Sequence, residues 1–187
     1  MFKQITNIII LLIFYPANAW KKINATGYDN NIQKDYLLPL ILTGVLTTVL
    51  GYSFNHSFDI QAVIKIISVV FLSYYIGFFA AACLIRLFIY KMYDQEIDWK
   101  RILHFTGYSF TVVLVINMIV GLIPVDAFFL KVFNLYTVAV VLHGSVVLGI
   151  AEEERSRFAI VATIIILVCP FAVKFLMNLM MPGMSVN

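Results

Sequence analysis

Charged side chains are scarce in this sequence, in which Asp, Glu, Lys and Arg make up 12% of 187 residues. Soluble domains carry about 25% charged residues and about 45–50% apolar ones. Here 62% of the residues are hydrophobic, and one water-soluble core of this size cannot hide so many apolar side chains. The composition therefore excludes an ordinary soluble domain and predicts that part of the protein is surrounded by lipid.

Motifs for disulfides, metals and nucleic acids are also missing. The two cysteines, Cys83 and Cys169, lie inside apolar runs and form no CxxC pair, so no disulfide framework is expected. No HExxH pattern occurs, and the acidic run Glu152–Glu154 is followed by arginine, which favours a solvated loop over a metal site shared with His104 and His143. Because no ligand motif is present, we expect no cofactor and no metal. The basic residues fall in short loops and form no single stripe, so we expect no nucleic-acid partner.

The first 23 residues combine a short apolar helix with an anchor of aromatic and basic residues. Lys3, the apolar run Ile5–Tyr15 and the small residues Ala17–Ala19 have the layout of a signal peptide, but the charge distribution described below argues against cleavage. The run is shorter than the about 20 residues that a membrane-spanning helix needs. We therefore predict an amphipathic helix lying at the membrane interface, which Pro16 breaks. The anchor residues, expected at the lipid headgroups, are Trp20, Lys21 and Lys22.

After a polar linker at residues 24–35, hydrophobicity predicts five membrane-spanning helices within residues 36–181 and a short external tail at residues 182–187. The predicted spans are Tyr36–Tyr52, Ile60–Tyr90, His104–Ile123, Ala127–Ile150 and Phe158–Met177. Short loops join them, and a turn that contains Pro124 separates the third span from the fourth. The predicted fold class is all-α: a polytopic membrane protein with five transmembrane helices preceded by the interfacial helix.

Basic residues are distributed unequally between the two sides that these spans define. One side, with the N-terminus and the loops before the third and fifth spans, holds ten Lys and Arg residues, whereas the other holds Lys65, Lys131 and Lys174. In membrane proteins the cytoplasmic loops carry the excess of Lys and Arg. The sequence thus predicts a cytoplasmic N-terminus and an external C-terminus. Cleavage after Ala19 would invert this distribution.

The loop before the third span is a candidate contact surface. It combines acidic and basic residues around an aromatic one, and Asp98 is positioned to cap the following helix. The residues proposed for a partner or lipid interface are Asp94, Glu96, Asp98, Trp99, Lys100 and Arg101, together with Trp20, Lys21 and Lys22. Close helix contacts, inside the protein or between copies of it, are expected at the small-residue pairs Gly77–Ala81 and Ser145–Gly149.

Several polar side chains fall at membrane depth in the third and fourth spans. They are His104, Ser109, Asn117, Asn134 and His143. Polar groups at this depth mark transport pathways or bond across helices as packing contacts, and the lack of an acidic residue among them counts against a proton-coupled carrier. Ser109 and His143 could also form the pair of an intramembrane hydrolase, which needs a serine hydroxyl within hydrogen-bond reach of an imidazole.

Three local signatures resemble those of one family. Tyr15-Pro16-Ala17-Asn18-Ala19-Trp20-Lys21-Lys22-Ile23 follows an apolar helix, Thr106-Gly107-Tyr108-Ser109 opens the third span, and Leu135-Tyr136 precedes His143-Gly144 in the fourth. Together with five spans, they resemble the Yip family of membrane proteins in its short prokaryotic form, over about residues 8–175. The resemblance implies five spans and a cytoplasmic N-terminus; eukaryotic members act in traffic between the endoplasmic reticulum and the Golgi and contact Rab-type GTPases. The acidic Asp-Leu-Tyr-Gly-Pro-type segment and the long N-terminal region of those members do not occur in this sequence, so the resemblance does not imply GTPase binding here.

These observations lead to one leading expectation and two alternatives. The leading one is a non-enzymatic protein of a prokaryotic plasma membrane that binds a partner protein or organises lipids, with no catalytic residue. Its expected partners are membrane lipids, a membrane or cytoplasmic protein, and a second copy of the chain. The first alternative is a small-molecule or lipid transporter or scramblase lined by the polar residues of the third and fourth spans. The second is an intramembrane hydrolase.

Overall fold

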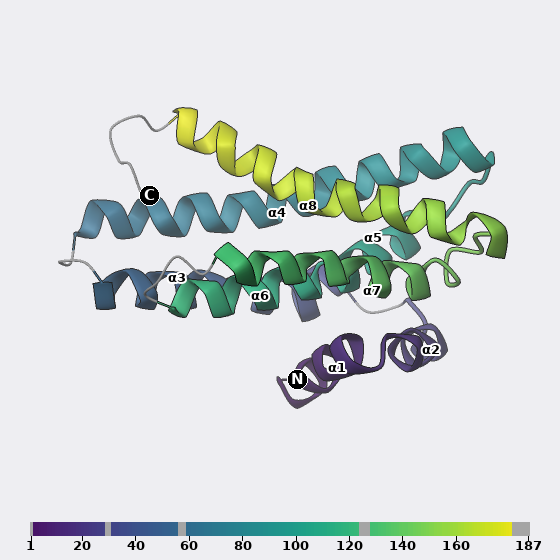
Figure 1. Ribbon diagram of the computed structural model, residues 1–187, viewed down its shortest axis with the longest axis horizontal. Helices are drawn as coiled ribbons and strands as arrows, with labels where there is room; N and C mark the ends of the chain where they lie inside the picture. Colours follow the sequence, from purple (N-terminus) through teal and green to yellow (C-terminus); the bar gives the residue numbers. More distant parts are fainter. Residues whose placement is uncertain (1, 29–30, 56–58, 124–127, 181–187) are drawn as a thin grey trace.

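The computed structural model describes residues 2–28, 31–55, 59–123 and 128–180, and all regular secondary structure in these ranges is helical. The helices in chain order are α1 (Phe2–Phe14), α2 (Pro16–Thr26), η1 (Gln33–Leu37), α3 (Leu38–Asn55), α4 (Ile60–Tyr93), α5 (Trp99–Ser109), α6 (Thr111–Leu122), η2 (Phe128–Tyr136), α7 (Thr137–Gly144), η3 (Glu152–Glu154) and α8 (Arg155–Met180). The long helices run side by side as an elongated bundle, and α1 and α2 lie along one flank of it (Figure 1). The all-α prediction is confirmed for the described residues.

Among the residues that the structure describes, four helical stretches are long and apolar enough to cross a membrane: Gln33–Phe54, Ile60–Tyr93, Trp99–Leu122 and Glu152–Met180. Two shorter apolar helices, Lys3–Phe14 and Phe129–Gly144, accompany them. Large apolar side chains such as Ile64, Ile160 and Phe171 are more than half exposed on the outside of the bundle. Contiguous apolar surface of this kind is stable against lipid and not against water, so the chain is a multi-pass membrane protein.

The region predicted as the fourth span is shorter and less regular than expected. Helical structure ends at Gly144, and Ser145–Gly149 form turns in which the Ile150 N–H donates to the Ser145 carbonyl (3.3 Å) and Gly149 takes φ +75°. This left-handed conformation suits glycine, and a Cβ added there would contact nothing within 4 Å. Gly149 therefore serves a turn, which corrects the prediction of a close helix contact at this residue. The Pro124 turn and the tail at 182–187 lie outside the described residues.

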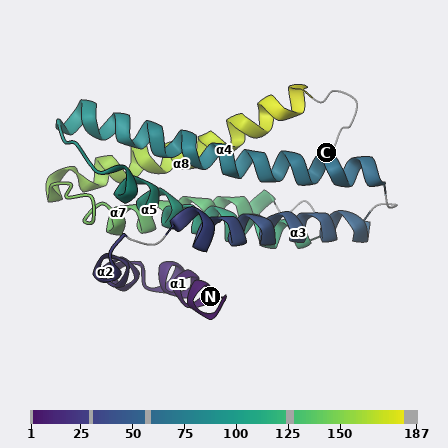
Figure 2. The same cartoon turned by 180° about the vertical axis from the view of Figure 1, so that it is seen from behind.

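Two helix pairs make up the bundle, because α4 packs most extensively on α8 and α3 on α6. Figures 1 and 2 show α4 and α8 running along the length of the molecule, with the C-terminal part of α8 diverging from α4, whereas α3 and α6 lie beside the N-terminal part of α4. Gly77 of α4 lies directly against Pro170, which stands inside α8. A proline inside a helix removes one backbone hydrogen bond and bends the helix. The contact predicted at Gly77 is therefore made inside the protein.

The N-terminal helices form a separate pair that packs on the bundle through α2. The helix is interrupted between α1 and α2 at Tyr15. Pro16 stands in the first turn of α2, where its missing N–H costs little. The break predicted at Pro16 is confirmed. α2 contacts α7, and the Tyr136 hydroxyl donates to the Ile13 carbonyl at the end of α1 (2.7 Å). The predicted linker at 24–35 is partly helical, since α2 continues to Thr26 and η1 begins at Gln33.

Replacing Gly77 by alanine should destabilise the α4–α8 contact. A Cβ at this position would lie 2.8 Å from Pro170 Cα, so backbone must move, and overpacking of this kind costs about 1–3 kcal/mol. Gly44→Ala is the matched control, because its Cβ would meet only the Met118 side chain at 3.8 Å. Thermal unfolding of the purified protein should show a lower midpoint for Gly77→Ala and an unchanged or higher one for Gly44→Ala. Equal midpoints would contradict the close contact.

Candidate functional site

One end of the bundle brings together the end of α4 and the beginnings of α5 and α8. The Phe158 ring, near the start of α8, lies 6.2 Å from the Phe88 ring, 6.4 Å from the Tyr93 ring and 5.8 Å from the Phe105 ring between centroids. The helix segments that carry these rings, at the end of α4 and the beginnings of α5 and α8, also hold six basic residues: Arg86, Lys91, Lys100, Arg101, Arg155 and Arg157. We call this the basic end.

The loop that joins α4 to α5 at the basic end exposes the charged residues predicted for an interface. Asp94 ends α4 in the left-handed conformation (φ 49°, ψ 36°), which aspartate tolerates better than most residues. Asp98 occupies the N-cap position of α5, but its side chain makes no capping hydrogen bond; its carbonyl accepts from the Ile102 N–H instead (3.2 Å). The side-chain cap predicted for Asp98 is therefore absent, and its carboxylate remains exposed beside those of Asp94 and Glu96.

An open groove of about 740 Å³ lies between this loop and α4. Its α4 wall consists of Cys83, Arg86, Leu87 and Tyr90, and its loop wall of Gln95, Glu96, Ile97 and Trp99. The Arg86 guanidinium lies 5.7 Å from the centre of the Trp99 ring, a cation–π contact that holds the half-buried indole against α4. We call this space the loop groove. It presents an arginine, a tryptophan and a carboxylate within one surface.

Trp20 is buried, in contrast with the headgroup position expected for it. Its exposed fraction is 2%, and its indole Nε1–H donates to the Val140 carbonyl of α7 (2.8 Å). The ring stacks on Phe105 at 5.7 Å and meets Tyr108 edge-on at 6.0 Å. Gly144 makes room for it, because a Cβ there would lie 2.6 Å from the indole. Trp20 thus fastens α2 to the bundle, whereas Lys21 and Lys22 beside it are exposed.

Tyr28 connects the segment after α2 to α5, a role that sequence patterning did not predict. Its ring meets the His104 imidazole edge-on at 5.2 Å, and the Arg101 guanidinium lies 5.7 Å from its centre. The Tyr28 hydroxyl donates to Asn24 Oδ1 (2.8 Å). Burial raises the pKa of the Tyr28 phenol, and the positive charge of Arg101 partly offsets that rise. Arg101 and His104 are therefore positioning contacts for this segment.

The polar residues predicted at membrane depth do not form a joint site. His143 Nδ1 lies 2.8 Å from the Ala139 carbonyl and the Asn117 amide donates to the Val113 carbonyl (2.7 Å), so each bonds to its own helix. His104 does the same through Nδ1 and the Lys100 carbonyl (2.8 Å). These hydrogen bonds of His104, Asn117 and His143 thus stay within one helix and do not cross to a neighbouring helix. In a helix the carbonyl four residues earlier lies within reach of such side chains.

Ser109 is fully buried, and its hydroxyl has no hydrogen-bond partner among the described residues. It makes no bond to His143, so the arrangement lacks the serine–imidazole contact that a hydrolase requires. The buried Asn134 Oδ1 and His104 Nε2 are likewise unpartnered within the described ranges. In residues 2–28, 31–55, 59–123 and 128–180 no three His, Cys, Asp or Glu side chains gather where they could hold a metal ion.

A hydrogen bond between η1 and α6 steadies the centre of the molecule. The Tyr36 hydroxyl lies 2.7 Å from Thr111 Oγ1, and Thr111 Oγ1 in turn donates to the Tyr108 carbonyl (2.6 Å). Because that donation uses the threonine proton, Tyr36 is the donor to Thr111. The bond from Thr111 to Tyr108 spans Phe110, the residue at which α5 passes into α6. Sequence patterning missed it, since both residues lie within apolar runs.

Comparison with known proteins identifies one related family. A family model described as the Yip1 domain matches residues 10–175 of the chain. No curated protein and no solved structure matches it.

Trp20→Phe should loosen α1 and α2 without unfolding the bundle. The variant keeps most of the ring packing but loses the donor to Val140, a bond worth about 0.5–1.5 kcal/mol. Hydrogen–deuterium exchange should rise in residues 2–26 and stay unchanged in α4 and α8. Trp99→Phe is the control, since that indole packs on Arg86 at the loop groove. Unchanged exchange in residues 2–26 of Trp20→Phe would show that the bond does not fasten α2.

Proposed function

The chain belongs to the Yip1 domain family, and we propose that it is a non-enzymatic five-span membrane protein that binds a partner protein through the loop groove at its basic end. The proposal has three parts: the number of spans, the orientation, and the contact surface. Each rests on a separate observation.

Five spans are supported by the direction in which the chain returns after α6. The Phe158 contacts put the start of α8 at the same end as the start of α5, so η2 and α7 must lead back to that end. A 3₁₀ helix rises about 2.0 Å per residue and an α-helix about 1.5 Å. The nine residues of η2 and the eight of α7 therefore extend over about 30 Å, the thickness of a hydrocarbon core. Because a 3₁₀ helix rises more per residue, η2 and α7 reach this length with fewer residues than an α-helix would need.

The orientation follows from the basic residues of the basic end. Lys and Arg residues concentrate on the cytoplasmic side of membrane proteins, so the basic end faces the cytoplasm, as does the exposed pair Lys21 and Lys22 on α2. α1 and α2 then lie on the cytoplasmic flank as interfacial helices, and α8 leads outward. The family resemblance of the sequence favours a prokaryotic plasma membrane.

The contact surface is supported by the composition of the loop groove, which is the observation that carries the functional proposal. Tryptophan, tyrosine and arginine are the residues that most often dominate binding energy at protein interfaces, and Trp99, Tyr90 and Arg86 line this groove together. The exposed carboxylates of Glu96 and Asp98 beside them can pair with lysine or arginine side chains of a partner protein, which an anionic lipid phosphate cannot supply. A protein with basic side chains therefore fits the groove better than a lipid does.

Transport of a small molecule or lipid is the second candidate. It draws support from the buried side-chain oxygens that have no partner among the described residues, Ser109 Oγ and Asn134 Oδ1, because a passing solute or water could satisfy them. In a Cys83→Ala, Cys169→Ala background, Asn117→Cys should react with a water-soluble thiol reagent if a hydrated path exists and stay unreactive if the bundle is closed.

Single cysteines should report the five-span topology. In the background without Cys83 and Cys169, Gln95→Cys and Glu153→Cys should resist a membrane-impermeant maleimide in intact cells and react after lysis, because both residues lie at the basic end. Gln61→Cys, exposed at the start of α4, should react in intact cells. Labelling of Glu153→Cys from outside would mean that η2 and α7 do not cross the membrane.

A photo-crosslinking amino acid should distinguish the partner-binding function. Placed at position 96 in native membranes, benzoylphenylalanine should give one protein adduct of defined mass, and the added substitution Asp98→Lys should lower its yield at least twofold by reversing the local charge. The same amino acid at position 61 is the control, because Gln61 is exposed at the opposite end. A position-96 probe that yields only lipid adducts would contradict the protein-binding function.

A further inference from the structure

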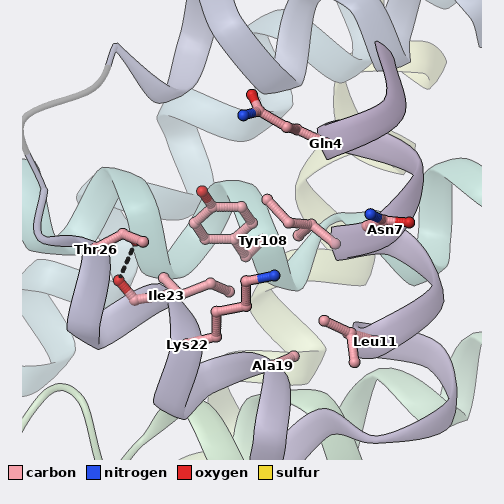
Figure 3. Close-up of a pocket in the computed structure, with 9 residues that line it drawn as sticks. Gln4, Asn7, Leu11, Ala19, Lys22, Ile23, Thr26 and Tyr108 are labelled. Carbon is pink, nitrogen blue, oxygen red and sulfur yellow. Dashed lines mark hydrogen bonds between the residues drawn. The ribbon is translucent and has the colours of Figure 1, made fainter. Parts of the chain in front are cut away.

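A cavity of about 230 Å³ lies between α1, α2 and the side chain of Tyr108 (Figure 3). We propose that it binds the phosphate-containing headgroup of an anionic membrane lipid. This site is separate from the loop groove, which faces α4, and the proposal does not depend on the identity of the protein partner. We call it the hairpin cavity.

Two helix faces with the same spacing build the walls of the hairpin cavity. α1 contributes Gln4, Asn7, Ile8 and Leu11, and α2 contributes Ala19, Lys22, Ile23 and Thr26. In each helix the four residues stand at positions i, i+3, i+4 and i+7, so they share one face. Tyr108 of α5 closes the space from the bundle side. Trp20, three residues before Ile23, donates to the Val140 carbonyl, and this hydrogen bond helps to hold the α2 wall beside Tyr108.

The polar groups of the hairpin cavity match a phosphate ester. Lys22 extends from α2 toward α1 beside the Tyr108 ring, while Gln4 and Asn7 bring side-chain amides from α1 (Figure 3). Phosphate oxygens accept hydrogen bonds, and a lysine ammonium and amide N–H groups donate them. Thr26 uses its hydroxyl proton on the Ile23 carbonyl (2.9 Å), which leaves its oxygen as an acceptor for a hydroxyl on the headgroup.

Charge around the cavity favours an anion. Residues 1–28 contain Lys3, Lys21 and Lys22 and neither Asp nor Glu, although the whole sequence has ten acidic residues. An anionic group here meets no carboxylate on its own two helices and gains attraction from three ammonium groups. A positively charged or zwitterionic headgroup lacks this advantage.

Size and surroundings point to a lipid as the source of the phosphate. A volume of about 230 Å³ is below the about 300–1,000 Å³ of a complete small-molecule site, so it accommodates a headgroup while the rest of the ligand stays outside. The α1 side chains Ile10 and Phe14 are 47% and 68% exposed, and each stands three residues after a residue that lines the cavity. They provide apolar surface for acyl chains, which inorganic phosphate or a soluble phosphate ester would leave uncovered.

The adjacent lysines give a matched test, because Lys22 lines the cavity and Lys21 does not. The full-length protein in detergent would be titrated with phosphatidylglycerol or phosphatidylcholine and the bound lipid counted by native mass spectrometry. Phosphatidylglycerol should bind at least tenfold more tightly than phosphatidylcholine. Lys22→Gln should weaken its binding about tenfold, the effect of losing one charge-assisted hydrogen bond, and Lys21→Gln less than twofold. Asn7→Leu should weaken binding without a change of net charge, and Lys22→Arg should retain it.

Three results would each overturn the proposal. If Lys21→Gln and Lys22→Gln weakened phosphatidylglycerol binding equally, the binding would reflect general attraction to a positive surface and not a specific site. Equal binding of the two lipids would exclude recognition of an anion. Displacement of phosphatidylglycerol by millimolar inorganic phosphate would make a soluble phosphate the ligand in place of a lipid. The melting temperature of each variant, measured in the same detergent without lipid, separates loss of binding from loss of folding.

Discussion

The packing of the Trp20 indole against Gly144 is the contact that holds α2 on the bundle. Hydrogen bonding to the Val140 carbonyl and stacking on Phe105 join α2 to α7 and α5 at one point. α1 packs on α2 and also contacts the bundle directly, through the bond from Tyr136 to the Ile13 carbonyl, so Trp20 positions α2 and only part of the packing of α1. The hairpin cavity follows as a consequence, and it would lose its inner wall if α2 moved away from Tyr108.

Three aromatic residues of the described chain make side-chain hydrogen bonds to distant parts of the sequence. Trp20 reaches α7, Tyr36 reaches Thr111, and Tyr136 reaches the Ile13 carbonyl. Short polar side chains such as Thr48, Ser73 and Asn117 bond instead to carbonyls three or four residues earlier in their own helices. The difference is one of reach: an aromatic side chain carries its polar atom beyond the helix surface, whereas a hydroxyl on Cβ stays close to its own backbone.

Hydropathy and proline placement were sufficient to predict the helical class, the helices at the first, second and fifth predicted spans within a few residues, and the helix break at Pro16. They could not predict where Trp20 lies, because an amphipathic indole is suited both to the headgroup region and to a buried position with a hydrogen-bond acceptor. The buried position depends on Gly144, which lies 124 positions away in the chain. The end of α7 was missed for a similar reason, since apolar residues continue to Ile150 after the helix stops. The exposed charges at Asp94, Glu96 and Lys100 were predictable from composition, but the groove beside them required the position of Arg86 on α4.

Because α4 is long, the distance of the loop groove from the membrane surface depends on the thickness of the membrane. Its 34 residues extend about 51 Å, well beyond a hydrocarbon core of about 30 Å. Hydrophobic mismatch of this size is relieved by tilting or by protrusion. In a thin bilayer more of α4 stands above the headgroups and carries Trp99 with it; in a thick one the same residues sink toward the lipid surface. Bilayer composition can therefore control how accessible the groove is to a protein in the aqueous phase.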